Sequence, residues 1–142
     1  MQAVRKERMI QKSILVSGKR KRAIARAAVR KGSGIIRINH QLLQNYEPRM
    51  SRMRIEEPLM IGSEYAGKVN IDIDVHGGGF QSQTEAARLC VARGLVAFSK
   101  SKQLKQDFLN YDRHLLIADV RRGEPSKPND SKPRKARTKS YR

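Results

Sequence analysis

The sequence predicts an α+β fold in which helices pack on one face of a β-sheet. Apolar and polar residues alternate over residues 69–75, which is the pattern of a half-buried strand. Three consecutive glycines follow this strand, and residues 82–98 then repeat their apolar positions with helical spacing. A strand, a glycine turn and a helix followed by another strand indicate an α+β sandwich.

The first forty residues contain the other strand-like segments. Residues 1–9 are polar without periodicity, so we expect an N-terminal extension there, and residues 13–17 form a β-branched run that predicts a strand. Residues 22–30 are ambiguous, because their alanines favour a helix whereas a period of two would place those alanines on one strand face. The Gly-Ser-Gly turn that follows and the strand-like residues 35–38 favour a hairpin. In either conformation one side carries Arg22, Arg26 and Arg30.

Helices are expected in the rest of the body. Residues 42–59 have a weaker helical pattern that two prolines interrupt. The Ser-x-x-Glu spacing that starts at Ser82 predicts a capping box, which opens a helix ending near residue 98. A second helix is expected over residues 101–110, and residues 115–118 can form a final strand. The side chains that these two helices should bury are Ala87, Cys90, Val91, Leu95, Phe98, Leu104 and Phe108.

The net charge of +18 is concentrated at the two ends of the chain. Residues 1–40 hold 12 basic side chains and one acid, residues 41–120 hold ten of each, and residues 121–142 hold nine basic side chains and two acids. Solubility alone requires less charge and no such segregation, so the pattern indicates a polyanionic partner. We therefore expect an N-terminal extension (1–9), a globular domain (10–120) and a basic tail (121–142).

We expect the tail to extend away from the body. It contains three prolines and almost no apolar side chain, so by itself it should be disordered. Fully extended, its roughly 20 residues would span about 60–70 Å. We expect it to order only on a nucleic acid.

The composition excludes several classes of protein. No run approaches the ~20 apolar residues of a membrane-spanning helix, and no secretory signal is expected. The single cysteine, Cys90, allows neither an internal disulfide nor a pair of zinc ligands. The three histidines lack partners at metal-ligand spacing, and the alternation places Asp72 and Asp74 on a solvated face. We expect a cytoplasmic protein with no catalytic residue, no metal, no cofactor and no membrane partner.

Two interpretations of the glycine run at residues 77–79 remain open. Backbone amides before a helix favour anions, so the run could cradle a phosphate, but it could equally be a plain turn. No Gly-Lys-Ser/Thr follows, so a nucleotide-binding P-loop is absent from the sequence. Aromatic residues are too few for a platform that stacks single-stranded RNA, and no helix has the pattern of a DNA base reader. Recognition of the backbone of a structured nucleic acid fits best.

Four separated motifs resemble one known family. They are SGKRKRAIARA at residues 17–27, GGGFQSQTEAAR at residues 77–88, YDR at residues 111–113 and KSYR at residues 139–142. Their order and spacing are similar to the family of the ninth protein of the small ribosomal subunit, in its archaeal form. The resemblance covers about residues 10–142.

This resemblance implies a particular version of the α+β class. The family has the fold of the second domain of ribosomal protein five: a mixed four-stranded sheet with a left-handed βαβ crossover, helices packed on one face, and an extended basic C-terminal tail. Such crossovers are rare, so the residue patterns alone do not predict one. It also implies that residues 22–30 form a strand. The chain departs from the family pattern at Val120, where proline is usual, and at Cys90, where a smaller residue is usual.

The resemblance also implies a function in translation. Members are structural constituents of the head of the small ribosomal subunit that bind the 3′ major domain of the small-subunit rRNA and contact the P-site tRNA. Their expected neighbours are small-subunit proteins seven, ten and fourteen. The basic runs and the family positions together predict rRNA contacts at Lys19, Arg20, Lys21, Arg22, Arg26, Arg30, Gly77, Gly78, Gly79, Gln83, Arg88, Arg93, Arg113, Arg121, Arg122, Lys132, Arg134, Lys135 and Arg137. The predicted contacts to P-site tRNA are Lys139, Ser140, Tyr141 and Arg142.

Two other functions are compatible with parts of the sequence. One is a phosphate- or nucleotide-binding enzyme, because the same fold superfamily includes small-molecule kinases; the missing P-loop lysine and magnesium ligand oppose it. The other is a free architectural protein that coats DNA, which the basic flanks alone would allow.

Overall fold

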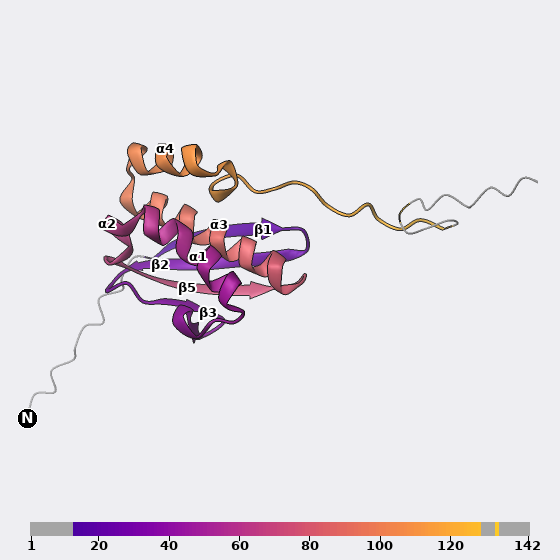
Figure 1. Cartoon of the computed structure of the whole chain (residues 1–142), viewed down its shortest axis with the longest axis horizontal. Coiled ribbons are helices and arrows are strands. Elements are labelled where there is room, and N and C mark those ends of the chain that lie inside the picture. The colour runs from indigo at the N-terminus through magenta and orange to yellow at the C-terminus, as the bar shows by residue number, and fades with distance from the viewer. Residues whose placement is uncertain (1–12, 129–132, 134–142) are drawn as a thin grey trace, which may run out of the picture.

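The computed structural model describes residues 13–128 and 133. In this part of the chain a five-stranded mixed sheet carries its helices on one face, which confirms the predicted α+β class (Figure 1). The expected N-terminal extension (1–9) and most of the tail (129–132 and 134–142) lie outside the described residues.

The sheet is built from one hairpin, one central strand and two short strands. Its members are β1 (Ile14–Arg20), β2 (Ala23–Lys31), β3 (Ile36–Ile38), β4 (Gln41–Leu42) and β5 (Val69–His76). Their order across the sheet is β1-β2-β5-β3-β4. Only β3 and β5 run parallel; β1 with β2, β2 with β5, and β3 with β4 are antiparallel pairs among the described strands.

The ambiguous segment at residues 22–30 is a strand, as the resemblance implied, but its partners differ from the expected hairpin. β2 pairs with β1 and β5, and β3 pairs with the opposite edge of β5. A hairpin between β2 and β3 is therefore wrong, because β5 lies between them. The expected count of four strands also changes, because Gln41–Leu42 add a short strand beyond β3.

The helices lie between and after the strands. They are α1 (Arg49–Ile61), α2 (Ser63–Ala66), α3 (Phe80–Ser99) and α4 (Lys102–Tyr111), with 3-10 turns η1 (Leu43–Asn45) and η2 (Arg113–Leu115). Pro48 is the N-cap of α1, whereas Pro58 lies inside the helix and does not break it. Residues 115–118 do not form the expected strand, because η2 ends at Leu115 and the chain then continues without regular structure.

The parallel pair contains the unusual connection that the resemblance implied. Strand β3 leads through α1 to β5, which is its parallel neighbour. In Figure 1 the helices lie in front of the sheet, β5 runs to the right, and β5 lies above β3. A crossover that passes in front of the sheet in this direction is left-handed.

The core lies between the sheet and the helices. Alternation in β2 points four side chains at α3, and the same alternation in β5 points four more toward the helices; they are Ala23, Ala25, Ala27, Val29, Val69, Ile71, Ile73 and Val75. Of the predicted helical core, Phe98 is only half-buried, whereas Leu95, Leu104 and Phe108 are buried as expected. No helix of the described residues packs on the opposite face of the sheet, and its polar side chains are exposed or half-buried in this part of the chain.

Candidate nucleic-acid interface

The candidate interface begins where the β1–β2 turn meets the glycine run. Gly77 and Gly78 have φ angles of +76° and +66°, a conformation that side chains with a Cβ atom rarely adopt. A Cβ atom on Gly77 would lie 2.7 Å from the Arg22 carbonyl oxygen, and one on Gly78 would lie 3.0 Å from the Ala23 amide nitrogen. Glycine is therefore required here because two turns are in close contact.

Helix α3 starts directly after these glycines. Its N-cap is Gly79, which offers no side chain to the first amides, so the predicted capping box from Ser82 is wrong. The N-cap lies three residues earlier than Ser82, because the Gly79 carbonyl already accepts from the Gln83 amide. The Gln83 side chain instead donates to the Gly77 carbonyl oxygen at 3.1 Å and supports the turn. The free amides at a helix N-terminus carry partial positive charge toward the solvent.

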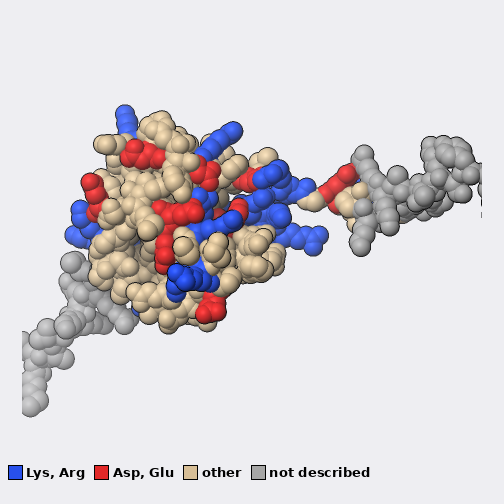
Figure 2. Space-filling model, in the orientation of Figure 1, with Lys and Arg blue, Asp and Glu red and all other residues tan. Residues whose placement is uncertain are grey.

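A cavity of about 560 Å³ opens beside this helix end. Its walls come from three segments that are far apart in the sequence: the β1–β2 turn, the glycine run with the first turn of α3, and the start of the tail. The side chains and backbone that line it include Lys21, Arg22, Gly78, Gly79, Ser82 and Arg122. Figure 2 shows Lys and Arg side chains gathered at the end of the body from which the tail leaves.

A second group of arginines occupies the open face of the sheet. Arg26 and Arg30 are exposed on β2, so the predicted sharing of one side holds for these two, and Arg22 is exposed in the turn before them. Arg30 lies 3.9 Å from the Asp72 carboxylate, and Arg37 lies 3.5 Å from it. Ion pairs this exposed contribute little to stability, so both arginines are available to a stronger anion.

Three of the predicted RNA-binding arginines are partly buried and have partners inside the protein. Arg20 contacts Glu85 and Asp119, Arg88 contacts Glu57 at 2.5 Å and Asp112 at 2.9 Å, and Arg93 donates to backbone carbonyls. The acceptors of Arg93 are the carbonyl oxygens of Leu116 and Ser17, at 3.0 and 2.6 Å.

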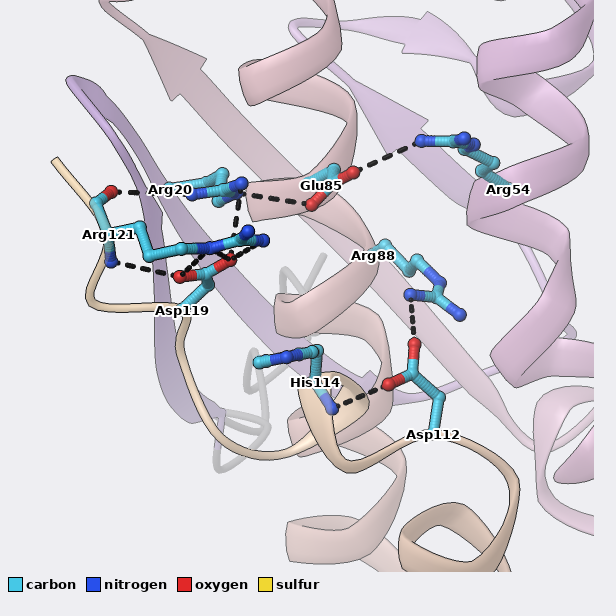
Figure 3. Close-up of polar contacts among 8 residues, drawn as sticks. All are labelled: Arg20, Arg54, Glu85, Arg88, Asp112, His114, Asp119 and Arg121. Carbon is cyan, nitrogen blue, oxygen red and sulfur yellow. Dashed lines mark hydrogen bonds and ion pairs between the residues drawn. The ribbon is translucent and has the colours of Figure 1, made fainter. Parts of the chain in front are cut away.

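These three arginines share one task in the described structure. Each joins the body to the segment between α4 and the tail: Arg88 at Asp112, Arg93 at Leu116 and Arg20 at Asp119. That segment has no strand to hold it, so arginine contacts replace a ladder of backbone hydrogen bonds. Figure 3 shows Arg20 and Arg88 reaching from β1 and α3 to this segment.

The carboxylates of this segment are held in their charged form. Desolvation opposes ionisation of Asp112, but the His114 amide and Arg88 outweigh it and lower the pKa of this carboxyl. Hydrogen bonds from the side chain and amide of Arg121 hold the pKa of Asp119 well below its usual range. Both side chains therefore act as permanent anions at neutral pH.

Sequence reasoning missed the acidic half of this arrangement. Glu85, which the spacing assigned to a capping box, accepts from Arg20 at 3.3 Å and from Arg54 at 3.1 Å. No periodicity or motif marks Asp119 or Arg54, because their partners lie on other elements.

The remaining predicted residues divide into two groups. Lys19, Arg113, Arg121 and Arg122 are exposed in the structure. The others, Lys132, Arg134, Lys135, Arg137, Lys139, Ser140, Tyr141 and Arg142, lie outside the described residues.

Within residues 13–128, nothing in the structure resembles a metal centre or a reactive thiol. No group of three or more metal-ligating side chains occurs among the described residues. Burial raises the pKa of the Cys90 thiol to about 12, and its sulfur contacts the Ala25 carbonyl oxygen. In the part of the chain that the structure describes, no helix is long and apolar enough to span a bilayer. The fold and the site thus define a small α+β protein with a cationic end formed by both flanks.

Comparison with known proteins identifies the family. The model of the ribosomal protein S9/S16 family matches residues 18–142. The small ribosomal subunit protein uS9 of Methanococcus vannielii is 46% identical over 127 residues, which cover 88% of this chain and 95% of the relative. The protein of the same name from Methanococcus maripaludis has the same identity and coverage. The chain belongs to the ribosomal protein S9/S16 family, and it is a structural small-subunit protein rather than an enzyme.

This membership confirms the resemblance found in the sequence, including its archaeal character. It also decides against the alternatives of a phosphate-binding enzyme and a free DNA-coating protein.

Proposed function

We propose that the protein binds small-subunit rRNA through its cationic end and the open face of its sheet, in the head of the subunit. The observation that carries this proposal is the convergence of the two basic flanks around one cavity, although they are about a hundred residues apart in sequence. Holding like charges together costs free energy that an anionic partner recovers. Phosphate contacts of this kind are independent of base sequence and depend strongly on salt.

The exposed cations are the proposed contacts in the described structure. They are Lys19, Lys21, Arg22, Arg26, Arg30, Arg113, Arg121 and Arg122, with the backbone of Gly77, Gly78 and Gly79. Arg20, Arg88, Arg93 and Gln83 serve the same interface indirectly, because their internal bonds hold the tail segment and the glycine turn in place.

The tail is proposed to reach RNA beyond the body. Residues 121–128 are exposed along their whole length and leave the body as an extended segment (Figure 1). We propose that Lys132, Arg134, Lys135 and Arg137 contact the 3′ major domain of the rRNA. At the end of the tail, Lys139, Ser140, Tyr141 and Arg142 are proposed to contact P-site tRNA, with small-subunit proteins seven, ten and fourteen as neighbours of the body.

Truncation of the tail tests the tRNA contact separately from rRNA binding. Small subunits reconstituted with a chain lacking residues 140–142 should assemble normally. They should bind P-site tRNA more weakly by about 1–3 kcal/mol, the range for a hydrogen bond to a charged group. Equal tRNA affinity for truncated and intact subunits at matched salt and magnesium would show that the tail end makes no such contact.

The rRNA contact is tested with the isolated chain and a transcript of the 3′ major domain. Replacing Arg26 with Gln should lower the slope of log K against log salt by roughly 0.7–0.9, the value for one lost phosphate contact. Lys105→Gln is the matched control, because Lys105 is an exposed cation on α4, away from the interface. If both variants change the slope equally, the open sheet face is not the contact surface.

A further inference from the structure

We propose that the ion pair between Arg20 and Asp119 holds the β1–β2 turn and the start of the tail side by side, so that together they form one phosphate-binding cavity. In this cavity the side chains of Lys21, Arg22 and Arg122 surround the backbone of Gly78 and Gly79. The ligand is one phosphate group with its negative charge exposed. The inference deepens the proposed function and rests on it, because a phosphodiester of bound RNA is one source of that group.

The first observation is a set of contacts among Arg20, Asp119 and Arg121, which we call the clasp. It holds the start of the tail, Arg121 and Arg122, which we call the tail root. Asp119 has a nearly buried side chain, 9% exposed, which forms an ion pair with Arg20 at 3.2 Å and accepts a hydrogen bond from Arg121 at 2.7 Å. Arg20 is also shielded, with 13% of its side chain exposed, and its remaining bonds run to Glu85 and to the Arg121 carbonyl oxygen. The last residue of β1 is thereby joined to the first residue of the tail.

The second observation is the place of the free cations relative to this clasp. Lys21 and Arg22 directly follow Arg20, and Arg122 directly follows Arg121. The three side chains line the same cavity of about 560 Å³, and all three are exposed. The clasp uses its carboxylates on Arg20 and Arg121, so the positive charge at the cavity comes from Lys21, Arg22 and Arg122. Glu124 also belongs to the lining, so these three cations outnumber one carboxylate there.

The third observation is the backbone on the inner wall. Gly78 adopts a φ of +66° against Ala23, and Gly79 precedes a 20-residue helix with no side-chain cap. Ser82, one turn along, adds a hydroxyl to the lining. Amide donors, a hydroxyl and three cations from separate segments match the acceptor-rich surface of a phosphate group.

This arrangement assigns different roles to neighbouring arginines. Arg22 and Arg122 are binding residues that contact the phosphate. Arg20 is a positioning residue, and so is Asp119, although the latter carries a negative charge close to an anion site. Removal of Asp119 should therefore strengthen RNA binding if only net charge matters and weaken it if the clasp positions the tail.

The decisive variant is Asp119→Asn in the full chain, measured with the 3′ major domain transcript. Removing a carboxylate raises the net charge, which alone should tighten RNA binding. If the clasp positions Arg122, the variant should instead bind about threefold to tenfold more weakly, because the tail root is released. The control is Asp107→Asn, which removes an exposed carboxylate from α4. Asp119→Asn binding that equals or exceeds that of the control would overturn the positioning role.

The single cavity is tested with Arg22→Gln, Arg122→Gln and the double variant. If the two arginines share one phosphate, the double variant should lower the salt slope by about one. A decrease of about two would show separate phosphates, and no decrease would show no contact; either result overturns the proposal. Circular dichroism melts check that each variant is folded as the native chain is.

Inorganic phosphate alone distinguishes the source of the ligand. The Gly78 and Gly79 amide resonances of the native chain are followed by NMR during titration with phosphate and, separately, with the transcript. Saturable shifts with both ligands indicate a site that accepts free phosphate, and shifts with the transcript alone indicate an RNA phosphodiester. Shifts with neither ligand overturn the cavity. If the native chain does not bind the transcript at all, the rRNA proposal fails, while the phosphate titration still tests the cavity.

Discussion

Replacing Gly18 with alanine should destabilise the body, because β1 and α3 approach each other closely at this residue. A Cβ atom at Gly18 would lie 2.5 Å from the Ala86 carbonyl oxygen, 3.1 Å from the Cys90 sulfur and 3.3 Å from the Cys90 amide nitrogen. The nearest of these atoms belongs to helix backbone, which cannot rotate away as a side chain can. The strand or the helix must therefore move to admit one methyl group.

The expected cost follows from this geometry. Overpacking of a tight interior site costs about 1–3 kcal/mol. We expect Gly18→Ala in the upper half of that range, because the contact is to backbone. Trimming the sulfur with Cys90→Ala should not rescue the variant, since the 2.5 Å contact to Ala86 would remain.

Gly67→Ala is the matched control. The same methyl group is added there, but a Cβ atom at Gly67 meets no other atom within 4 Å, and the residue has a right-handed helical conformation. Adding alanine at such a site removes freedom from the unfolded chain and stabilises by about 0.4–1 kcal/mol.

Urea unfolding at equilibrium measures both variants through the free energy of unfolding extrapolated to water. The result expected is a large decrease for Gly18→Ala and none for Gly67→Ala. A Gly18→Ala protein as stable as the native chain would refute the close packing of β1 on α3.

Three further predictions follow from the described contacts. The Cys90 thiol, with its pKa raised to about 12, should not react with a disulfide reagent at pH 8 until urea unfolds the chain; rapid reaction of the folded protein would contradict its burial. The lowered pKa of Asp112 stabilises the folded state. This stabilisation is complete above about pH 4, the pKa of an aspartate in the unfolded chain, and is lost as the pH falls below that value. In acid, the free energy of unfolding should therefore decrease less steeply with falling pH for Arg88→Gln than for the native chain; equal slopes would contradict the role of Arg88. Gly77→Ala should lower the melting temperature, because its Cβ atom would clash with the β1–β2 turn and its φ is positive. Gly79→Ala should not lower it, because a Cβ atom there meets nothing within 4 Å. Equal melting temperatures for the two variants would disprove the tight turn.

Several features of this protein are determined by local sequence. The alternation over β5 and the apolar spacing of α3 and α4 each specify an element and its buried face, and the structure has all three. The segregation of charge into two flanks is visible in the residue order alone. The motifs around residues 17–27 and 77–88 were specific enough to indicate the family.

The pairing of strands was decided by tertiary structure. β2 and β3 are separated by a short glycine turn, as strands of a hairpin would be, yet β5 lies between them. The turn pattern describes only a few residues, whereas β5 pairs with β2 over eight residues from Ile24 to Lys31. Long-range pairing over that length outweighs the local preference of one turn.

The roles of the individual arginines were also decided in three dimensions. In the sequence Arg20 and Arg22 are members of one basic run and cannot be told apart. In the fold Arg20 lies between Glu85 and Asp119, whereas Arg22 lines a cavity. A charge binds RNA or holds the fold according to which opposite charges lie within a few ångströms, and only the packing of α3 and the tail root on β1 brings those carboxylates to Arg20.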